Sequence, residues 1–257
     1  MYSTSKLLTW LSLSLLFALL ISLPVQAEKG KTVSFVIGLS LEPYFIKGGK
    51  GIIGEIISES LQSQGYSVSF QNRSNLEALK AFNNHQYDAV AVVTPEMVNA
   101  FLSKPFAQFD NRVITLADGT PAITELAQLQ GLSIIGFSNA RTYLGDDFEK
   151  TIKHANYREI ESQLEQARAL LDGEVDAIVT DTFIFEFNRK RLIRKSPMSK
   201  KYRKAIQPGY NFHRDPFYAA FHHKHAQQAF NRGYQQLLDR GRVDVILNKY
   251  RALLISY

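Results

Sequence analysis

The sequence predicts an α/β fold with two similar lobes, because one pattern occurs twice, at 76–94 and again at 164–181. Each copy has an amphipathic helical stretch, a short turn, an Asp-Ala pair and an apolar run too short for a helix. Such a run is typical of a strand that is buried on both faces of a parallel sheet. Two lobes imply a cleft, and ligands of open α/β sheets bind beyond the carboxyl ends of the strands. Those ends are 94–96 and 180–182.

The first lobe begins with alternating strands and helices. The stretch 32–38 is an apolar strand pattern, and 51–64 has apolar residues at helical spacing before Gly65. Alternation of polar and apolar residues over 66–70 predicts a second strand. The first repeat copy then adds a helix and a third strand, and this β-α-β-α-β order is typical of a parallel sheet.

An extended segment at 111–115 leads into the second lobe. Its expected elements are a helix at 123–130, a strand at 132–137, a helix at 141–154, a strand at 157–160, the second repeat copy and a helix at 182–193. A strand at 217–221 and helices at 224–239 and 243–254 return to the first lobe. The first lobe is therefore discontinuous, comprising 28–115 and 208–257, and the second is 116–207. Two crossings, near Thr115 and Gln207, suit closure by hinge bending.

The N-terminus has the plan of a secretory signal peptide. A charged start precedes an apolar run over 7–23 and a small-residue exit at 24–27. The run approaches the length of a bilayer span, so a retained membrane anchor is the alternative. We favour cleavage of 1–27 after Ala27, which would deliver the chain to the periplasm. The chain has no cysteine, and this excludes disulfides and thiolate chemistry.

Positive charge is concentrated in one segment, 189–204, which holds nine Lys and Arg residues and no acidic residue. An anionic partner such as lipid headgroups or nucleic acid is one interpretation. A solvated surface is the other, and we favour it because Tyr202 is the only aromatic residue there that could stack on a base. We therefore expect no nucleic-acid partner.

Several short motifs follow one another along the chain. They are Glu-Pro-Tyr-Phe at 42–45, Gly-Ile-Ile-Gly at 51–54, Tyr-Asp-Ala at 87–89 before Thr-Pro-Glu at 94–96, Ser-Lys-Pro-Phe at 103–106, Leu-Gln-Gly at 129–131, and Gly-Glu-Val-Asp-Ala at 173–177 before Asp181. Together they resemble the family 3 extracellular solute-binding proteins, the periplasmic receptors of polar amino acid ABC importers. The resemblance implies a two-lobed periplasmic-binding-protein-like fold of type II, with a mainly parallel sheet flanked by helices in each lobe. It implies no cofactor.

The resemblance also implies which residues contact the solute. Tyr44 would form an aromatic wall, with Phe45 either beside it or packed in the lobe. The hydroxyl and backbone near Thr94 would hydrogen-bond the ligand, and Asp181 would receive its ammonium group. Asp181 is equally suited to cap the helix that follows it.

Glu42, Glu96 and Asp181 could converge on the cleft, where carboxylates can perform acid/base chemistry. A lyase similar to the cyclohexadienyl dehydratases is therefore the alternative to a receptor. Histidines at 213, 222, 223 and 225 are expected to be surface residues rather than metal ligands, because neighbouring side chains on a strand point to opposite faces.

One position departs from the family pattern. Met97 stands where the family has an Arg that holds the ligand carboxylate in a bidentate pair. Arg141 is the candidate replacement, because it lies at a predicted helix start, where free amides favour anions. The alternative is a solvent-facing Arg, and Arg112 is a weaker candidate.

The sequence thus predicts a monomeric receptor that closes on a small polar solute, an amino acid or a similar molecule, without chemistry. Its predicted ligand-binding residues are Glu42, Tyr44, Thr94, Glu96, Arg141 and Asp181. Its partner would be an inner-membrane ABC permease or a membrane sensor.

Overall fold

The computed structural model describes residues 31–39, 41–212 and 216–255, which fall within one compact unit, Lys31–Tyr257. The predicted signal peptide, 1–27, lies outside the described residues. Among the helices that are described, none combines the length and the apolar character that crossing a membrane requires.

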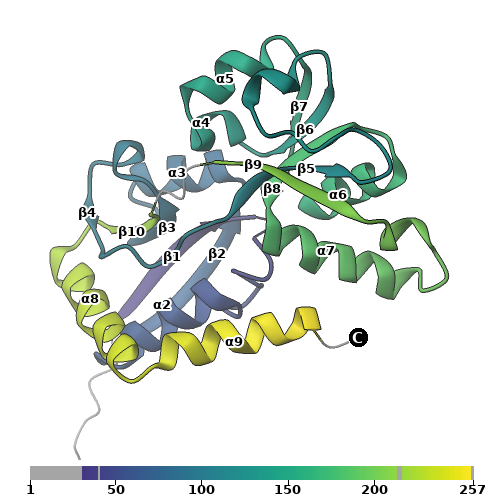
Figure 1. Cartoon of the computed structure of the whole chain (residues 1–257). Coiled ribbons are helices and arrows are strands. Elements are labelled where there is room, and N and C mark those ends of the chain that lie inside the picture. The colour runs from purple at the N-terminus through teal and green to yellow at the C-terminus, as the bar shows by residue number, and fades with distance from the viewer. Residues whose placement is uncertain (1–30, 40, 213–215, 256–257) are drawn as a thin grey trace, which may run out of the picture. The chain divides into compact units, whose positions relative to one another are not determined.

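The first sheet has five strands in the order β2-β1-β3-β10-β4 (Figure 1). In chain order they are β1 (Thr32–Gly38), β2 (Ser67–Arg73), β3 (Ala89–Val93), β4 (Phe101–Leu102) and β10 (Tyr218–Phe221). Strand β1 is parallel to β2 and β3, whereas β10 is antiparallel to β3 and β4. Every residue of β3 is buried, as its apolar run predicts.

The second sheet repeats this arrangement in the order β7-β6-β8-β5-β9. Its strands are β5 (Asn111–Leu116), β6 (Ser133–Phe137), β7 (Asn156–Ile160), β8 (Ala177–Asp181) and β9 (Ile206–Asn211). Strand β6 is parallel to β7 and β8, and β5 is antiparallel to β8 and β9. The predicted pair of α/β lobes is confirmed. Each sheet contains both parallel and antiparallel pairs. The antiparallel strands are β10 in the first sheet and β5 in the second, and the chain reaches each of them directly after crossing from the other lobe.

Helices cover both faces of the first sheet. Helices α2 (Ile52–Gln62), α8 (Lys224–Asp239) and α9 (Arg242–Ile255) pack together, and α3 (Asn75–Asn83) packs on β1, β2 and β3. Neighbouring residues of β1 serve the two layers: Phe35 belongs to the core with α2 and α8, and Val36 belongs to the core with α3. This explains why β1 is apolar at consecutive positions rather than alternating.

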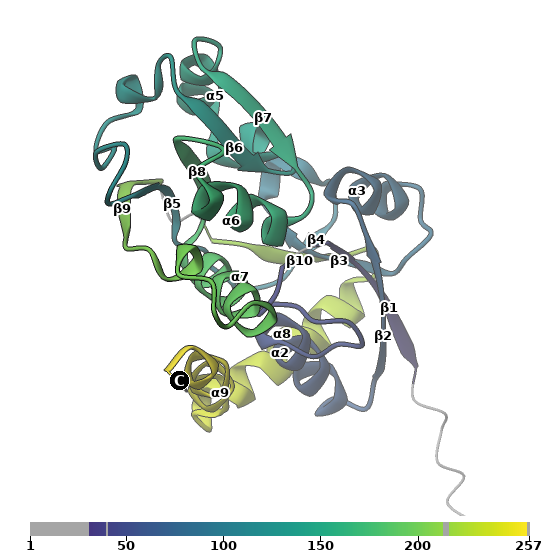
Figure 2. The ribbon, with the colours of Figure 1, turned by 90° about the vertical axis from the view of Figure 1, so that its right-hand side faces the viewer.

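The second sheet is covered in the same way (Figure 2). Helices α6 (Gln163–Asp172) and α7 (Thr182–Lys195) share a core with Ile135 and Ile178, while α4 (Ala140–Leu144) and α5 (Asp146–Ile152) share one with Ile134 and Val179. The single helix predicted over 141–154 is wrong. Gly145 separates α4 from α5 with a φ of 85°, a conformation that does not continue a helix. The helix predicted over 123–130 is reduced to a 3-10 turn, Leu126–Leu129.

The repeated Asp-Ala pair has the same structural role in both lobes. Asp88 accepts hydrogen bonds from the backbone N–H and the hydroxyl of Ser34, with distances of 2.8 and 2.6 Å. Asp176 accepts the same two bonds from Ser133, at 2.8 and 2.6 Å. In each lobe the Asp therefore fastens the turn before the third strand to the first strand.

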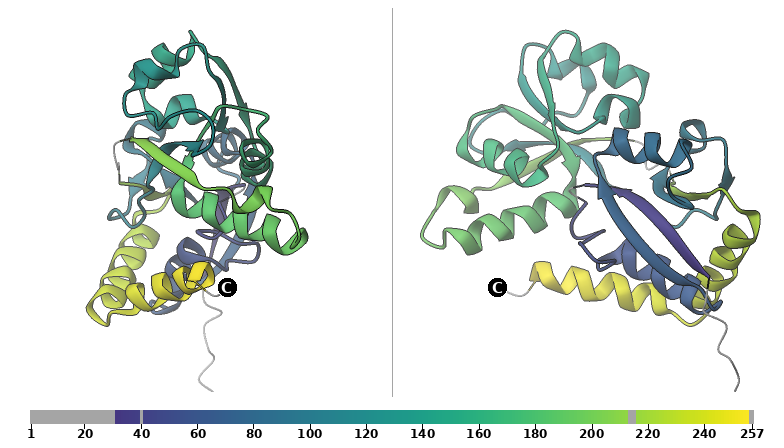
Figure 3. Two further views of the ribbon diagram at one scale, coloured as in Figure 1. Left: turned by 45° about the vertical axis from the view of Figure 1, so that its right-hand side comes forward. Right: turned by 180° about the vertical axis from the view of Figure 1, so that it is seen from behind.

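The chain passes between the sheets twice, from β4 to β5 and from β9 to β10 (Figure 3). Thr115 and Gln207, which mark the predicted hinge, pair with each other inside the second sheet. The predicted lobe boundaries, at residues 115 and 208, therefore fall within β5 and β9, and both of these strands belong to the second sheet. The crossing segments contact each other, since Ala107 and Phe217 form an isolated antiparallel bridge.

Candidate functional site

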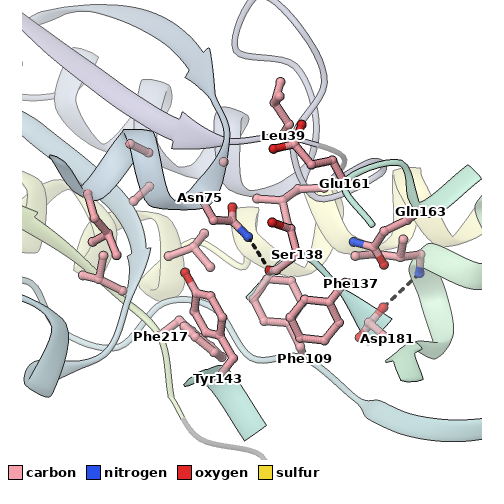
Figure 4. Close-up of a pocket in the computed structure, with 18 of the residues that line it drawn as sticks. Leu39, Asn75, Phe109, Phe137, Ser138, Tyr143, Glu161, Gln163, Asp181 and Phe217 are labelled. Atoms are coloured by element: carbon pink, nitrogen blue, oxygen red, sulfur yellow. Dashed lines mark hydrogen bonds between the residues drawn. The ribbon is translucent and has the colours of Figure 1, made fainter. Parts of the chain in front are cut away.

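A cavity of about 60 Å³ lies between the two sheets (Figure 4). Gly38, at the end of β1, and Asn75, at the start of α3, contribute from the first lobe. Phe137, at the end of β6, and Asp181, at the end of β8, contribute from the second. The cavity therefore lies at the carboxyl ends of parallel strands, where ligands of α/β sheets bind.

A second cavity, of about 610 Å³, adjoins the first. Both are lined by Phe109, Asn111, Tyr143 and Phe217. Thr94 and Glu96 line the second cavity, together with the polar residues Thr142, Asp146, Asp147, Lys150 and Tyr210. Residues predicted to contact one ligand are thus divided between two adjoining spaces.

Asp181 is buried and caps α7. Its Oδ1 accepts the N–H of Ile184 at 2.9 Å, and its Oδ2 accepts the N–H of Asp110 at 2.7 Å and the hydroxyl of Tyr44 at 3.3 Å. Burial raises the pKa of the Asp181 carboxyl, while the surrounding donors oppose that rise. The helix-cap interpretation is confirmed, and contact with a ligand stays a prediction.

Tyr44 connects the lobes but lines neither cavity. Its ring contacts Phe109 at 4.7 Å and Phe183 at 5.7 Å between centroids. Burial and the neighbouring Asp181 raise the pKa of its hydroxyl, so this group is a donor at neutral pH. Phe45 is 3% exposed and packs in the core of the first lobe, which favours the packing interpretation. Glu42 lines neither cavity.

The Thr-Pro-Glu segment forms a short 3-10 turn after β3. The Thr94 side chain stabilises the charged form of the neighbouring Glu96 carboxyl and thereby lowers the pKa of Glu96. Met97, which stands in place of the family Arg, packs against the core cluster around Val93 and Phe82. Its side chain therefore serves packing, and this position brings no positive charge to the cavities.

Arg141 is engaged away from both cavities. Its guanidinium is 3.7 Å from the carboxylate of Glu159 and lies over the ring of Tyr157, and its side chain is 52% exposed. Glu159 also accepts the backbone N–H groups of Asn139 and Arg141, at 2.8 and 3.0 Å. The backbone N–H groups at the start of α4 therefore already bind the carboxylate of Glu159. The structure does not bring Arg141 together with Asp181 or Thr94.

Tyr143 is the main site residue that the sequence prediction misses. It lines both cavities, its ring contacts Phe137 and Phe217, and its hydroxyl makes no hydrogen bond to another described residue. Burial raises the pKa of this hydroxyl to about 12, so it is protonated at neutral pH. An aromatic residue six positions after a strand end is the only signal in the sequence.

Asn75 also goes unpredicted, although it links the lobes across the cavity. Its Nδ2 donates to the carbonyl oxygen of Ser138 at 3.1 Å (Figure 4). Ser138 follows β6 directly, and Asn75 follows the capping residue of α3. Nothing local in the sequence distinguishes this Asn from an ordinary residue at a helix start.

The basic segment 189–204 lines neither cavity. It comprises the end of α7, a loop and the 3-10 turn Lys201–Arg203. Three of its cations pair with carboxylates outside the segment: Arg189 with Glu186, Lys201 with Asp172 and Lys204 with Asp118. These pairs support the interpretation of a solvated surface.

Comparison with solved structures shows what the chain resembles. An ancestral arginine-binding protein bound to arginine matches with a TM-score of 0.69 and 17% identity, over 87% of this chain and 99% of that chain. A Streptococcus pneumoniae amino acid ABC transporter substrate-binding protein, AbpA, bound to L-arginine, matches with a TM-score of 0.69 and 13% identity, over 89% and 98% of the two chains. A histidine kinase sensor domain with similarity to periplasmic binding proteins matches with a TM-score of 0.69 and 15% identity, over 87% and 97%.

No family model and no curated protein sequence matches the chain. At these low identities, structural similarity shows the architecture rather than the ligand. The protein has the two-lobed fold of the periplasmic binding proteins, as its sequence predicts.

Proposed function

We propose that this protein is an exported solute-binding protein that holds a small polar solute between its lobes and releases it unchanged. The observation that carries the proposal is the cavity at the carboxyl ends of β1, β6 and β8, which residues of both sheets line. Such a site forms only when the lobes approach each other, so solute binding and closure would be coupled.

Two hydrogen bonds between the lobes support this coupling. Asn75 donates to Ser138 beside the cavity, and Tyr44 donates to Asp181 behind it. Both join first-lobe residues to groups at the ends of second-sheet strands. In the proposed mechanism these bonds form on closure, and the chain bends in the crossing segments that Ala107 and Phe217 connect.

Asp181, Thr94 and Glu96 remain proposed ligand contacts, because each lines one of the two cavities. Tyr44 would act by closing the lobes, and Glu42 and Arg141 would act outside the site. A lyase is less well supported, because Glu42, Glu96 and Asp181 do not line a common cavity. The solute would pass to a membrane permease or be reported to a membrane sensor.

The test is thermal unfolding of the purified full chain with a panel of amino acids, amines, organic acids and sugars. A solute that binds only the folded state, present at 100 times its Kd, should stabilise the protein by about 2.7 kcal/mol. Mass spectrometry of the recovered solute should show it unchanged. A converted solute would support the lyase, and a panel without effect would contradict the proposal.

A matched pair of variants locates the site. Asn75→Ala removes a cavity residue and an inter-lobe hydrogen bond, and should raise the Kd about fivefold, because one hydrogen bond contributes about 1 kcal/mol. Asn83→Ala changes an exposed Asn at the far end of the same helix and should leave the Kd unchanged. Equal affinities of the two variants would place the solute elsewhere.

A further inference from the structure

Negative charge dominates the two adjoining cavities. The charged side chains that line them are Glu161, Asp181, Glu96, Asp146, Asp147 and Lys150. Five of these are acidic, and the one ammonium, that of Lys150, lies 3.4 Å from a carboxylate oxygen of Asp147. A carboxylate that entered this space would meet like charge and find no unpaired cation among the described lining residues.

Nearby arginines do not change this balance. Arg141 pairs with Glu159, and Arg112 pairs with Asp110 at 3.0 Å and also donates to the carbonyl of Gly209. Neither lines a cavity. Binding of a carboxylate would require one of them to leave its partner, which would leave that partner charge uncompensated.

Four aromatic rings line the smaller cavity, together with aliphatic side chains of the first lobe. Phe137, Tyr143 and Phe217 are joined by ring contacts, with 6.2 Å between Phe137 and Tyr143 and 6.0 Å between Tyr143 and Phe217. Phe109 adds a ring 5.1 Å from Phe217. Figure 4 shows Phe137, Tyr143 and Phe217 on one side of the cavity and Glu161 on another. The faces of such rings attract cations.

The Tyr143 hydroxyl is an independent sign of a ligand. The Tyr143 side chain is half-buried, it lines both cavities, and its hydroxyl has no hydrogen-bond partner among the described residues. This hydroxyl is therefore available on the cavity wall to accept a hydrogen bond from a ligand or to donate one to it.

On the basis of the proposed function, we infer that the solute is a small organic cation that carries no carboxylate. Its ammonium group lies against the rings of Phe137, Tyr143 and Phe217, and the carboxylates of Glu161 and Asp181 supply the compensating charge. A primary amine would also hydrogen-bond to the Tyr143 hydroxyl, whereas a quaternary ammonium would use the rings alone. Met97 fits this inference, because a ligand without a carboxylate needs no arginine at that position.

The test is a set of ligand pairs that differ only by a carboxylate. Isothermal titration of the purified full chain compares agmatine with arginine, histamine with histidine, phenethylamine with phenylalanine and ethanolamine with serine, with tetramethylammonium as the quaternary probe. The amine of at least one pair should bind at least tenfold more tightly than its amino acid, because burial of an unpaired carboxylate is unfavourable. The Kd of the amine should rise with ionic strength.

The outcomes separate the two proposals. If an amino acid binds as tightly as its amine, the protein is a solute-binding protein and the cation inference is overturned. If no ligand of any charge binds, both proposals are contradicted.

Variants then assign the contacts. Phe137→Leu should raise the Kd for a bound amine about five- to thirtyfold. Tyr143→Phe, which keeps the ring, should weaken a primary amine about fivefold and leave tetramethylammonium unchanged. Glu161→Gln should weaken both cations by up to about fivefold, whereas Glu174→Gln, an exposed carboxylate that lines neither cavity, should weaken neither. Unchanged affinity in Phe137→Leu and Glu161→Gln would overturn the assignment.

Discussion

The carboxylate of Asp181 receives hydrogen bonds from three separate parts of the chain. The N–H of Ile184 belongs to α7, the N–H of Asp110 to the crossing segment, and the hydroxyl of Tyr44 to the loop before α2. All three partners donate hydrogen bonds, so the side chain at this position must accept them, as the carboxylate of Asp181 does. The sequence predicts Asp at a strand end before a helix, but only the structure shows that the same side chain joins both lobes.

Asp181→Ala should lower the free energy of unfolding by about 3 kcal/mol, because it removes a helix cap and leaves buried N–H groups unpaired. Urea unfolding followed by circular dichroism, without added solute, measures this change. Ser74→Ala, which removes the cap of α3 at a more exposed site, should lower it by only about 1 kcal/mol. Similar values for the two variants would show that the buried donors of Asp181 find other acceptors.

The hydrogen bonds between Ser133 and Asp176 join the start of β6 to the turn before β8. They should make the stability of the protein depend on pH in the acid range. The Ser133 hydroxyl and N–H donate to the Asp176 carboxylate and hold the pKa of Asp176 below its usual value. A pKa lowered by folding contributes stability that is fully present above about pH 4, the unfolded value, and is lost as the pH falls toward the folded value.

Asp176→Asn cannot titrate, so this variant should lose less stability than the native chain between about pH 4 and 3. Urea midpoints measured across this range test the expectation. Glu174→Gln, at an exposed turn position in the same lobe, should keep the native pH dependence. Parallel pH profiles for Asp176→Asn and the native protein would rule out this contribution of Asp176.

Helix boundaries were harder to predict than the helices themselves. The apolar spacing over 141–154 predicts one helix, yet Gly145 adopts a φ of 85° and a ψ of 173°, so the chain turns between α4 and α5. Gly145→Ala should lower the free energy of unfolding by about 1–3 kcal/mol, because this conformation is strained for a residue with a side chain. Gly119→Ala, where an added Cβ meets only ordinary contacts and φ is not positive, should change it by less than about 0.5 kcal/mol. Equal effects in the two variants would contradict this account.

Two of the hydrogen bonds that join the lobes lie near the cavity, one between Asn75 and Ser138 and one between Tyr44 and Asp181. Tyr44→Phe keeps the ring contacts with Phe109 and Phe183 and removes the hydrogen bond to Asp181. In the closure equilibrium that we propose, one such bond contributes about 1 kcal/mol, so the ratio of closed to open molecules should fall about fivefold. Small-angle X-ray scattering should show a larger radius of gyration without solute and recovery when solute is added. Tyr66→Phe is the control, because the Tyr66 hydroxyl makes no hydrogen bond to another described residue. A radius equal to that of the native protein would show that Tyr44 does not hold the lobes together.

The two α/β lobes can be predicted from the sequence alone, because buried parallel strands require apolar runs such as β3 and β8, and a repeated helix and Asp-Ala pair marks each one. It did not predict β9, because Pro208 and Gly209 disfavour a strand interior, and an edge position in the sheet tolerates them.

Which of the candidate site residues lie close together depends on how distant segments pack. Arg141 and Glu159 lie 18 positions apart and pair, while Tyr143, which no motif marks, lines both cavities. The reason is physical: the periodicity of a segment depends on which of its faces is buried, whereas a binding site depends on the distance between segments, and periodicity carries no information about that distance.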